Sequence, residues 1–458
     1  MGSAGSSPQP HRGDRAVWPR SVLLAIAILA AATPASAAYW DVEPVYSDGM
    51  GSGDTSLAIS AANIPNVSYA ANGFLYRAEK QVGSWTQEPV AKVGFWGGLS
   101  SIAFNGAGQP CIAFIDASGV LTNYLKYAYK SASWTVETIQ EIGWLGDHVS
   151  LAMGQSGQPC IAYCRTGASD TCLSFARRAG PNWWLTEDIT PIGSITGPAL
   201  AFDSSGAAYV AFAESVSGCL KVARSAGGPW TIQTIDGGPG ALVIPYPAIT
   251  IQPNGKPALA YFVSGSSSSE LRLAAYDGAS WSIQTAAALG PSRVGHCSVC
   301  VTNSGMPMIC FQDPATACLK NAWRTDSTWV TEFVDSAPRT GGRPSMKLDG
   351  LGNVDVSYFD SGGYNVKFAW AIAPTTVHHA KSLPDGRVVQ ISGIVASTAS
   401  DDLSGLLYAQ APDRTSGIQL RFPTVVPQVA RGDILDVQGP LTTVNGERAL
   451  NDPLVVAY

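Results

Sequence analysis

The strongest constraint on the fold is a motif of about 48 residues that recurs seven times along the chain. Each copy reads as a short strand of small apolar residues, a glycine-containing turn, a second strand ending in Tyr or Phe, a third strand, and then Trp-x-x-Glu. A repeat of this length, built only from strands and turns, is typical of a β-propeller. The repeat therefore predicts an all-β fold, whereas function depends on the residues that the scaffold carries.

The first strand of each copy is short and mostly apolar, as expected for strands crowded around a central axis. The seven copies begin at Ser56, Ser101, Ser150, Ala199, Ala248, Ser298 and Ser345. The following turn is Gly-x-Pro in four copies, where glycine supplies a positive φ and proline begins the next strand. In the third strand, alternation such as Leu125-Lys126-Tyr127-Ala128 predicts that the lysine faces solvent.

The fourth strand carries tryptophan, and its copies indicate how the ring closes. Six Trp-x-x-(Glu/Gln) segments begin between Trp85 and Trp329, and the seventh lies at the other end of the chain, in Trp40-Asp41-Val42-Glu43. We therefore predict seven blades, with the N-terminal strand pairing into the last blade, which removes exposed sheet edges. Because these tryptophans recur in every copy, we expect them to be structural.

The repeat region, residues 38–373, resembles a broad family of secreted bacterial propellers with Gly-x-Pro-x-Ile-Ala-Tyr and Leu-x-Tyr-Ala units, as at 157–163 and 125–128. It is also distantly similar to sialidase-like propellers. That resemblance implies Ser-x-Asp-x-Gly-x-Thr-Trp boxes and an arginine cluster, but the boxes are absent, and Arg165 and Arg343 do not make an arginine triad. The resemblance thus indicates the fold rather than an activity.

The pattern changes after residues 374–385, which we predict to be a linker. Residues 386–458 predict five strands separated by polar turns, which fits a small barrel. Segments 383–386, 407–418, 432–433 and 446–448 resemble the OB-like domain appended to many secreted bacterial proteins. From residue 380 onward there are six Lys/Arg, eight Asp/Glu and few aromatic residues, so we expect no nucleic-acid binding.

The N-terminus has the pattern of an export signal. Arg12, Arg15 and Arg20 precede an apolar run over 22–32, and Ala35-Ser36-Ala37 fits a cleavage site. We predict a signal peptide over residues 1–37 and a mature protein that is secreted, periplasmic or at the cell surface. The apolar run is too short for a permanent anchor, so none is expected after cleavage. The formal charge of −6 argues against a nucleic-acid or anionic-membrane surface.

The nine cysteines mostly replace Ala or Ser at repeated positions, which favours small buried side chains over a disulfide framework. Cys164 and Cys172 are the best candidates for a disulfide, across one hairpin. Cys297-x-x-Cys300 has no second half nearby. We predict no metal site, no cofactor and a monomeric chain.

Candidate ligand-binding residues are polar or aromatic residues that break the repeat at one mouth of the central channel. Loops from the fourth strand into the next blade gather there, as do loops that join second and third strands, and such mouths usually hold ligands. The first group of loops contributes Asp54, Trp96, Asp147, His148, Tyr246, His296 and Arg343. The second group contributes Asp116, Arg165, Asp170, Glu214, Asp313 and Asp360. His148 and His296 are the two histidines of the repeat region and fall at this loop position in their copies, which is the strongest functional indication.

Three functional interpretations remain open. The first is a non-catalytic exported propeller that binds a glycan or protein ligand at the channel mouth. The second is a glycan hydrolase or lyase, in which His148 beside Asp147 acts as a general base together with His296 and Arg343. The third is a structural protein of the cell envelope, in which these loop residues only cap turns. Serine-hydrolase, zinc-protease and phosphate-loop motifs are absent, so the non-catalytic interpretation is favoured.

Overall fold

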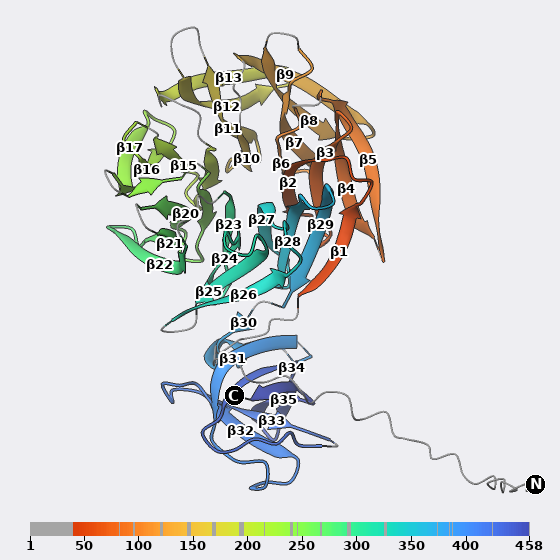
Figure 1. Ribbon diagram of the computed structural model, residues 1–458, viewed down its shortest axis with the longest axis vertical. Helices are drawn as coiled ribbons and strands as arrows, with labels where there is room; N and C mark the ends of the chain where they lie inside the picture. Colours follow the sequence, from red (N-terminus) through yellow and green to blue (C-terminus); the bar gives the residue numbers. More distant parts are fainter. Residues whose placement is uncertain are drawn as a thin grey trace, which may run out of the picture. The chain divides into compact units, whose positions relative to one another are not determined.

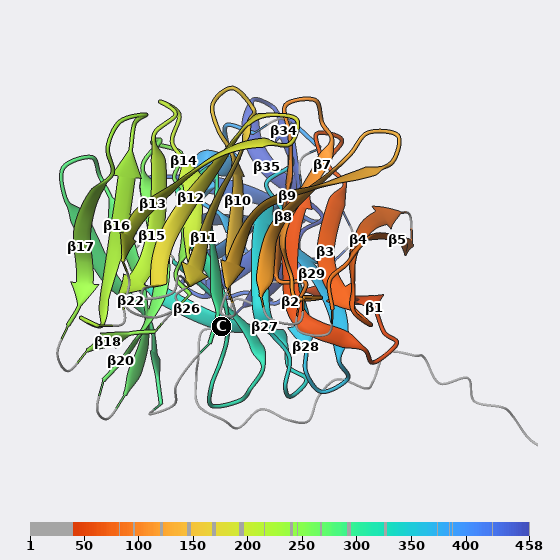
Figure 2. The same cartoon turned by 90° about the horizontal axis from the view of Figure 1, so that it is seen from above.

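The structure, a computed structural model, describes residues 40–457 except for 82, 95–96, 120–121, 144–147, 167–170, 192–196, 215, 239–240, 245, 266–267, 291–294, 325–327, 373, 384, 387 and 424. Figures 1 and 2 show seven small antiparallel sheets arranged around a central axis, with a separate sheet domain formed by the C-terminal part of the chain. The predicted all-β, seven-bladed propeller is therefore confirmed.

In blades 1 to 6 the strands run from the channel outward in chain order, and in blade 7 the outer strand is β1. Blades 1 to 3 comprise β2 (Gly51–Ile59), β3 (Pro65–Ala71), β4 (Phe74–Gln81) and β5 (Ser84–Lys92); β6 (Ser100–Phe104), β7 (Pro110–Asp116), β8 (Asn123–Lys130) and β9 (Trp134–Gly143); and β10 (Val149–Met153), β11 (Pro159–Thr166), β12 (Thr171–Gly180) and β13 (Trp183–Pro191). Blades 4 and 5 comprise β14 (Ala199–Phe202), β15 (Ala208–Glu214), β16 (Cys219–Ser225) and β17 (Thr231–Gly237); and β19 (Ala248–Ile251), β20 (Pro257–Ser264), β21 (Ser269–Tyr276) and β22 (Trp281–Leu289), with the short β18 (Leu242–Val243) beside β20. Blades 6 and 7 comprise β23 (Cys297–Val301), β24 (Pro307–Gln312), β25 (Leu319–Arg324) and β26 (Trp329–Asp335); and β27 (Gly342–Leu348), β28 (Val354–Asp360), β29 (Asn365–Ala371) and β1 (Asp41–Tyr46).

The N-terminal strand closes the ring as the displaced seventh tryptophan motif predicted. β1 pairs antiparallel with β29, with Asp41 opposite Trp370, and so supplies the outer strand of blade 7. The inner strands contact one another all the way round, from β2 through β27 and back to β2. Closure leaves β29 paired on both sides, which removes an edge on which other chains could assemble.

Among the described residues, six of the seven repeated tryptophans link their blade to the preceding one by a hydrogen bond, and Trp134 of blade 2 is the exception. The Trp40 indole N–H donates to Glu332 of blade 6 at 3.1 Å, and Trp85 of blade 1 donates to Glu43 of blade 7 at 2.6 Å. The same bond to the preceding blade's Glu or Gln is made by Trp184, Trp230, Trp281 and Trp329. The expected structural role of the motif is confirmed. In the motif of blade 7, for example, Trp40 bonds to the preceding blade and Glu43 accepts a bond from the following one.

Seven hydrophobic clusters lie between neighbouring blades, one at each interface. Between blades 7 and 1, for example, Phe368 packs with Leu57, Val67 and Tyr69. Fully burying one such side chain contributes about 1.5–3 kcal/mol, so each interface stabilises the ring.

The lysines of the third strands do not simply face solvent, and that expectation was wrong. Lys126, Lys221 and Lys320 form ion pairs at 2.6–2.8 Å with Asp116, Glu214 and Asp313, which lie at or directly after the ends of the neighbouring second strands. Each lysine side chain is only 21–24% exposed. Partly buried pairs keep more of their attraction than pairs in open solvent, because fewer waters screen them.

The C-terminal domain consists of β30 (Pro374–Thr375), α1 (Val377–Ala380), β31 (Val388–Ala396), β32 (Leu406–Gln410), β33 (Gly417–Arg421), β34 (Ile434–Val444), β35 (Glu447–Asn451) and β36 (Leu454–Ala457). Five of these strands pair in the cyclic order β31-β32-β33-β35-β34 and back to β31, which closes a small barrel. Its assignment as an OB-like domain remains a proposal. Much of the predicted linker folds with this barrel, since β30 pairs with β31 and Val377 and Ala380 lie in the barrel core.

The strand register contradicts the suggested Cys164–Cys172 disulfide. Cys164 lies opposite Leu173, and Cys172 lies opposite Arg165. The two are thus one register position apart, where side chains point to opposite faces of the sheet. The predicted signal peptide lies outside the described residues, and within the described part of the chain no helix is long and apolar enough to cross a membrane.

Candidate functional site

Five of the predicted residues from the blade-to-blade loops line one cavity at the channel mouth. They are Asp54, His148, Tyr246, His296 and Arg343, which come from blades 1, 3, 5, 6 and 7. The cavity, here called the axial pocket, has a volume of about 150 Å³ and is also lined by serines at the starts of the inner strands. These residues are far apart in sequence, and the propeller brings them together because each occupies the same position in its repeat.

The aromatic side of the axial pocket is a stacked trio of rings. The Tyr246 ring contacts both histidines, with centroids 4.5 Å from His148, to which it is tilted, and 4.3 Å from His296, on which it stacks. The two imidazoles are themselves 5.5 Å apart and nearly parallel, at 15°. The histidines therefore share one centre rather than facing opposite sides of the ring.

Gly197, which the sequence did not single out, makes room for this trio. It occupies in blade 4 the position that Tyr246 occupies in blade 5, and a Cβ built there would lie 2.1 Å from Cδ1 of Tyr246. Any larger residue would push the tyrosine out of its stack. A glycine at the repeat position where the other copies carry larger residues was the available sequence signal.

The charged side of the axial pocket pairs blades 7 and 1. A guanidinium nitrogen of Arg343, Nη1, lies 3.8 Å from Oδ1 of Asp54, and the other carboxylate oxygen of Asp54 accepts a hydrogen bond from the Ser100 N–H at 3.0 Å. The Arg343 carbonyl accepts from the Thr55 hydroxyl at 3.2 Å. The ion pair between Arg343 and Asp54 is thus long, whereas the backbone carbonyl of Arg343 is fixed by its hydrogen bond from Thr55.

Two buried polar atoms in this pocket make no hydrogen bond to any part of the chain that the structure describes: Nη1 of Arg343 and Nε2 of His296. Burying a donor or acceptor without a partner costs about 1–3 kcal/mol, so such atoms in a cavity indicate a place for a ligand or solvent group. Burial, followed by the charges of His148 and Arg343, holds the pKa of His296 well below its ordinary value. His296 is consequently neutral at pH 7 and has a basic nitrogen available.

The second group of predicted residues is engaged within the blades rather than gathered in the axial pocket. Asp116, Glu214 and Asp313 pair with lysines as described above, and Arg165 donates from Nε to Asp188 at 2.8 Å. Burial raises the pKa of Asp116, but its bonds to Lys126 and Ser118 outweigh this effect and leave the pKa below its ordinary value. These carboxylates also accept from turn residues, such as Thr316 on Asp313 at 2.7 Å, and so stabilise the loops.

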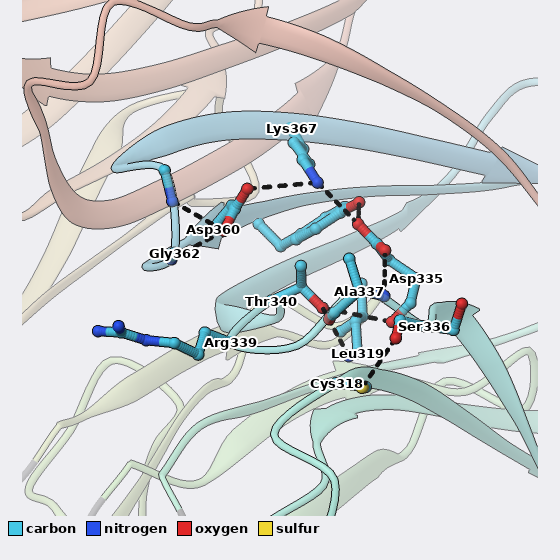
Figure 3. Close-up of polar contacts among 12 residues, drawn as sticks. Cys318, Leu319, Asp335, Ser336, Ala337, Arg339, Thr340, Asp360, Gly362 and Lys367 are labelled. Atoms are coloured by element: carbon cyan, nitrogen blue, oxygen red, sulfur yellow. Dashed lines mark hydrogen bonds and ion pairs between the residues drawn. The ribbon is translucent and has the colours of Figure 1, made fainter.

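Asp360 belongs to the same class. Figure 3 shows Lys367 between Asp335 and Asp360, at 3.1 and 3.3 Å, while Asp360 also accepts from the Gly362 N–H at 2.9 Å. A ligand that used Asp360 would have to break this network. Trp96, Asp147 and Asp170 lie outside the described residues.

The arrangement does not resemble a metal centre or a pair of catalytic carboxylates. Across the described residues, no group of three or more His, Cys, Asp or Glu side chains is placed to hold a metal ion. Among the described residues that line the axial pocket, Asp54 is the one carboxylate, whereas glycoside hydrolysis ordinarily uses two. The pocket instead combines donors, acceptors and ring faces.

Comparison with known proteins gives structural matches alone. No protein-family model matches the chain, and no curated protein matches it significantly in sequence. A streptogramin B lyase structure matches with 13% identity and a TM-score of 0.49, over 72% of this chain and 97% of the lyase. An ulvan lyase bound to a saccharide matches with 11% identity and a TM-score of 0.48, over 71% of this chain and 94% of that one. The fucoside-bound lectin of Aleuria aurantia matches with 13% identity and a TM-score of 0.41, over 65% of this chain and 98% of the lectin. At these identities and TM-scores the matches carry no inference about function.

Proposed function

We propose that the mature protein is an exported glycan-binding propeller whose axial pocket holds one sugar residue. The observation that carries the proposal is the pair of buried atoms without a hydrogen-bond partner among the described residues, Arg343 Nη1 and His296 Nε2, in one pocket with the acceptor Asp54. A sugar ring presents hydroxyl groups that both donate and accept. It therefore fits a pocket that mixes a guanidinium, a carboxylate and an imidazole.

Charge supports a hydroxyl-rich ligand over a simple anion. Arg343 is balanced by Asp54 at 3.8 Å, and the depressed pKa of His296 leaves its ring uncharged at pH 7. The Arg343–Asp54 pair and the neutral His296 thus add no net positive charge of the kind that concentrates anions. The stacked rings of His148, Tyr246 and His296 add an aromatic wall of the kind that packs against apolar ring faces.

A glycan array tests this function. We expect wild-type protein to bind a defined set of oligosaccharides, and Arg343→Gln to weaken the strongest of them by roughly 10–100-fold, since a hydrogen bond to a charged group contributes about 1.5–3 kcal/mol. Arg165→Gln is the matched control, because that arginine is already bonded to Asp188. Folding of each variant is checked by circular dichroism. An array on which the wild type retains no glycan would refute the proposal.

The neutral His296 favours a second candidate, a lyase acting on a glycan that carries a uronic acid. In such an elimination a neutral imidazole takes the proton from the carbon next to the carboxylate, and a carbon–carbon double bond forms as the bond to the leaving oxygen breaks. That oxygen then takes a proton, for which this candidate assigns the hydroxyl of Tyr246, whose ring stacks on His296. Arg343 would neutralise the carboxylate. Appearance of the ultraviolet absorbance of an unsaturated uronate, lost in His296→Gln, is the readout that separates this candidate from simple binding.

A further inference from the structure

A second and larger cavity adjoins the axial pocket where blade 7 meets blade 1. This seam groove has a volume of about 590 Å³ and is lined by Met50, Asn72, Leu99, Arg343, Phe359 and Tyr364, together with several glycines. Arg343 lines both cavities, so one side chain forms their common wall. The connection from β1 to β2 runs along the groove, and Leu99, just before β6 of blade 2, also lines it.

The volumes show that the two cavities suit different parts of one ligand. At about 150 Å³ the axial pocket is smaller than the roughly 300–1,000 Å³ typical of small-molecule sites, so it accommodates little more than a single ring. The seam groove falls within that range. A ligand anchored on Arg343 and longer than one residue therefore has space to continue into the groove.

The groove also has a surface suited to sugar rings. The Tyr364 side chain is 54% exposed, while Phe359 beneath it is 8% exposed and contacts it edge-on, with centroids 6.2 Å apart. The carbonyl of Tyr364 accepts the Gly51 N–H at 2.9 Å, which ties the turn bearing this ring to the β1–β2 connection. An exposed aromatic ring held by its backbone and braced from below is a rigid platform for an apolar ring face.

We propose that the seam groove is an extended subsite for the second and third residues of an oligosaccharide whose terminal residue occupies the axial pocket. The proposal rests on the glycan-binding function proposed above and adds the substrate class, a chain end rather than an isolated monosaccharide. The ligand would lie from the channel axis outward between blades 7 and 1, with Arg343 contacting the junction of the first two residues.

The test uses calorimetric titration of the mature protein with two probe series, chito-oligosaccharides and oligogalacturonates, each from monosaccharide to pentasaccharide. We expect affinity in at least one series to rise by about 10-fold or more up to the trisaccharide and then to level off. Tyr364→Ala should weaken the trisaccharide by about 3–10-fold and leave the monosaccharide unchanged, whereas Tyr364→Phe should retain wild-type affinity. Trp183→Ala, which removes a 61% exposed ring on blade 3, is the control.

The outcomes separate this inference from the function on which it rests. If monosaccharide and trisaccharide bind equally well, or if Tyr364→Ala binds the trisaccharide like wild type, the extended subsite is wrong and the axial site stands. If no member of either series binds and the glycan array is also blank, both proposals are wrong.

Discussion

Arg343 and Tyr246 hold backbone conformations that side chains other than glycine seldom adopt. Their φ angles are +46° and +82°, and each residue directly precedes a proline, Pro344 or Pro247. A left-handed conformation at a residue other than glycine costs about 1–3 kcal/mol and persists only when the surroundings impose it. In both cases the outcome is a side chain directed into the axial pocket by a backbone that cannot relax.

At the same scale, the lowered pKa of His296 predicts a pH effect on stability. Below about pH 6.5 the unfolded chain binds a proton at this histidine that the folded chain does not, so the free energy of unfolding should fall as the pH falls. Replacing His296 with Gln removes that loss. We therefore expect that, as the pH is lowered from 7.5 to 5, the melting temperature of wild type falls more than that of His296→Gln.

The control for this prediction is His378→Gln, which removes a histidine from α1 of the C-terminal domain. Thermal melts of the three proteins across the pH range give the comparison. Identical pH profiles for wild type and His296→Gln would show that the imidazole is protonated as readily in the folded chain as in the unfolded one.

At the scale of elements, the serine at the start of most inner strands forms a hydrogen bond to the next blade, which its small size did not suggest. In five blades its hydroxyl accepts the backbone N–H of the next inner strand at 2.9–3.1 Å, from Ile102, Leu151, Leu200, Met346 and Leu57. Ala199 and Ala248 occupy this position in the other two blades and cannot accept. The sequence predicted a crowded apolar strand, whereas the structure adds a chain of hydrogen bonds around the channel.

These bonds predict the effect of removing one hydroxyl. Ser150→Ala deprives the Leu200 N–H of its acceptor at 2.9 Å, and we expect a loss of about 1–3 kcal/mol in the free energy of unfolding. Urea denaturation gives the shift in midpoint. Ser133→Ala, in an exposed turn of blade 2, should change stability by less than about 0.5 kcal/mol. Equal midpoints for the two variants would argue that this bond contributes nothing.

At the scale of the whole molecule, the ring depends on joining the two ends of the repeat region. β1 supplies the outer strand of blade 7, and Trp40 bonds to Glu332 of blade 6 while Glu43 accepts from Trp85 of blade 1. The interfaces on both sides of blade 7 therefore rely on the same short strand. The seam groove lies between blades 7 and 1, one of these two interfaces.

Removing this strand should open the ring. We expect a chain that begins at residue 51 to expose β29 as an edge, to melt at lower temperature and to self-associate, because an unpaired edge strand is a template for other strands. The milder Trp40→Ala should cost about 1–3 kcal/mol, against little change for the exposed Trp183→Ala. Size-exclusion chromatography with light scattering and thermal melts provide the readouts. A monomeric truncated chain with unchanged stability would contradict this account of closure.

The number of blades, their order and the closing strand follow from the sequence alone, because a periodic pattern of strands and turns has few ways to bury its apolar faces. The sequence also identified one position per repeat at the channel mouth, and five residues so identified line the axial pocket. Which polar residues remain available there depends on how the folded chain pairs its side chains. Asp116, Glu214, Asp313 and Asp360 bind lysines one strand away, whereas Arg343 and His296 keep polar atoms without a hydrogen bond among the described residues. The reason is that hydrogen bonds and ion pairs are made or lost by differences of a few tenths of an ångström in the distance between side chains, and the period of a repeat does not encode such differences.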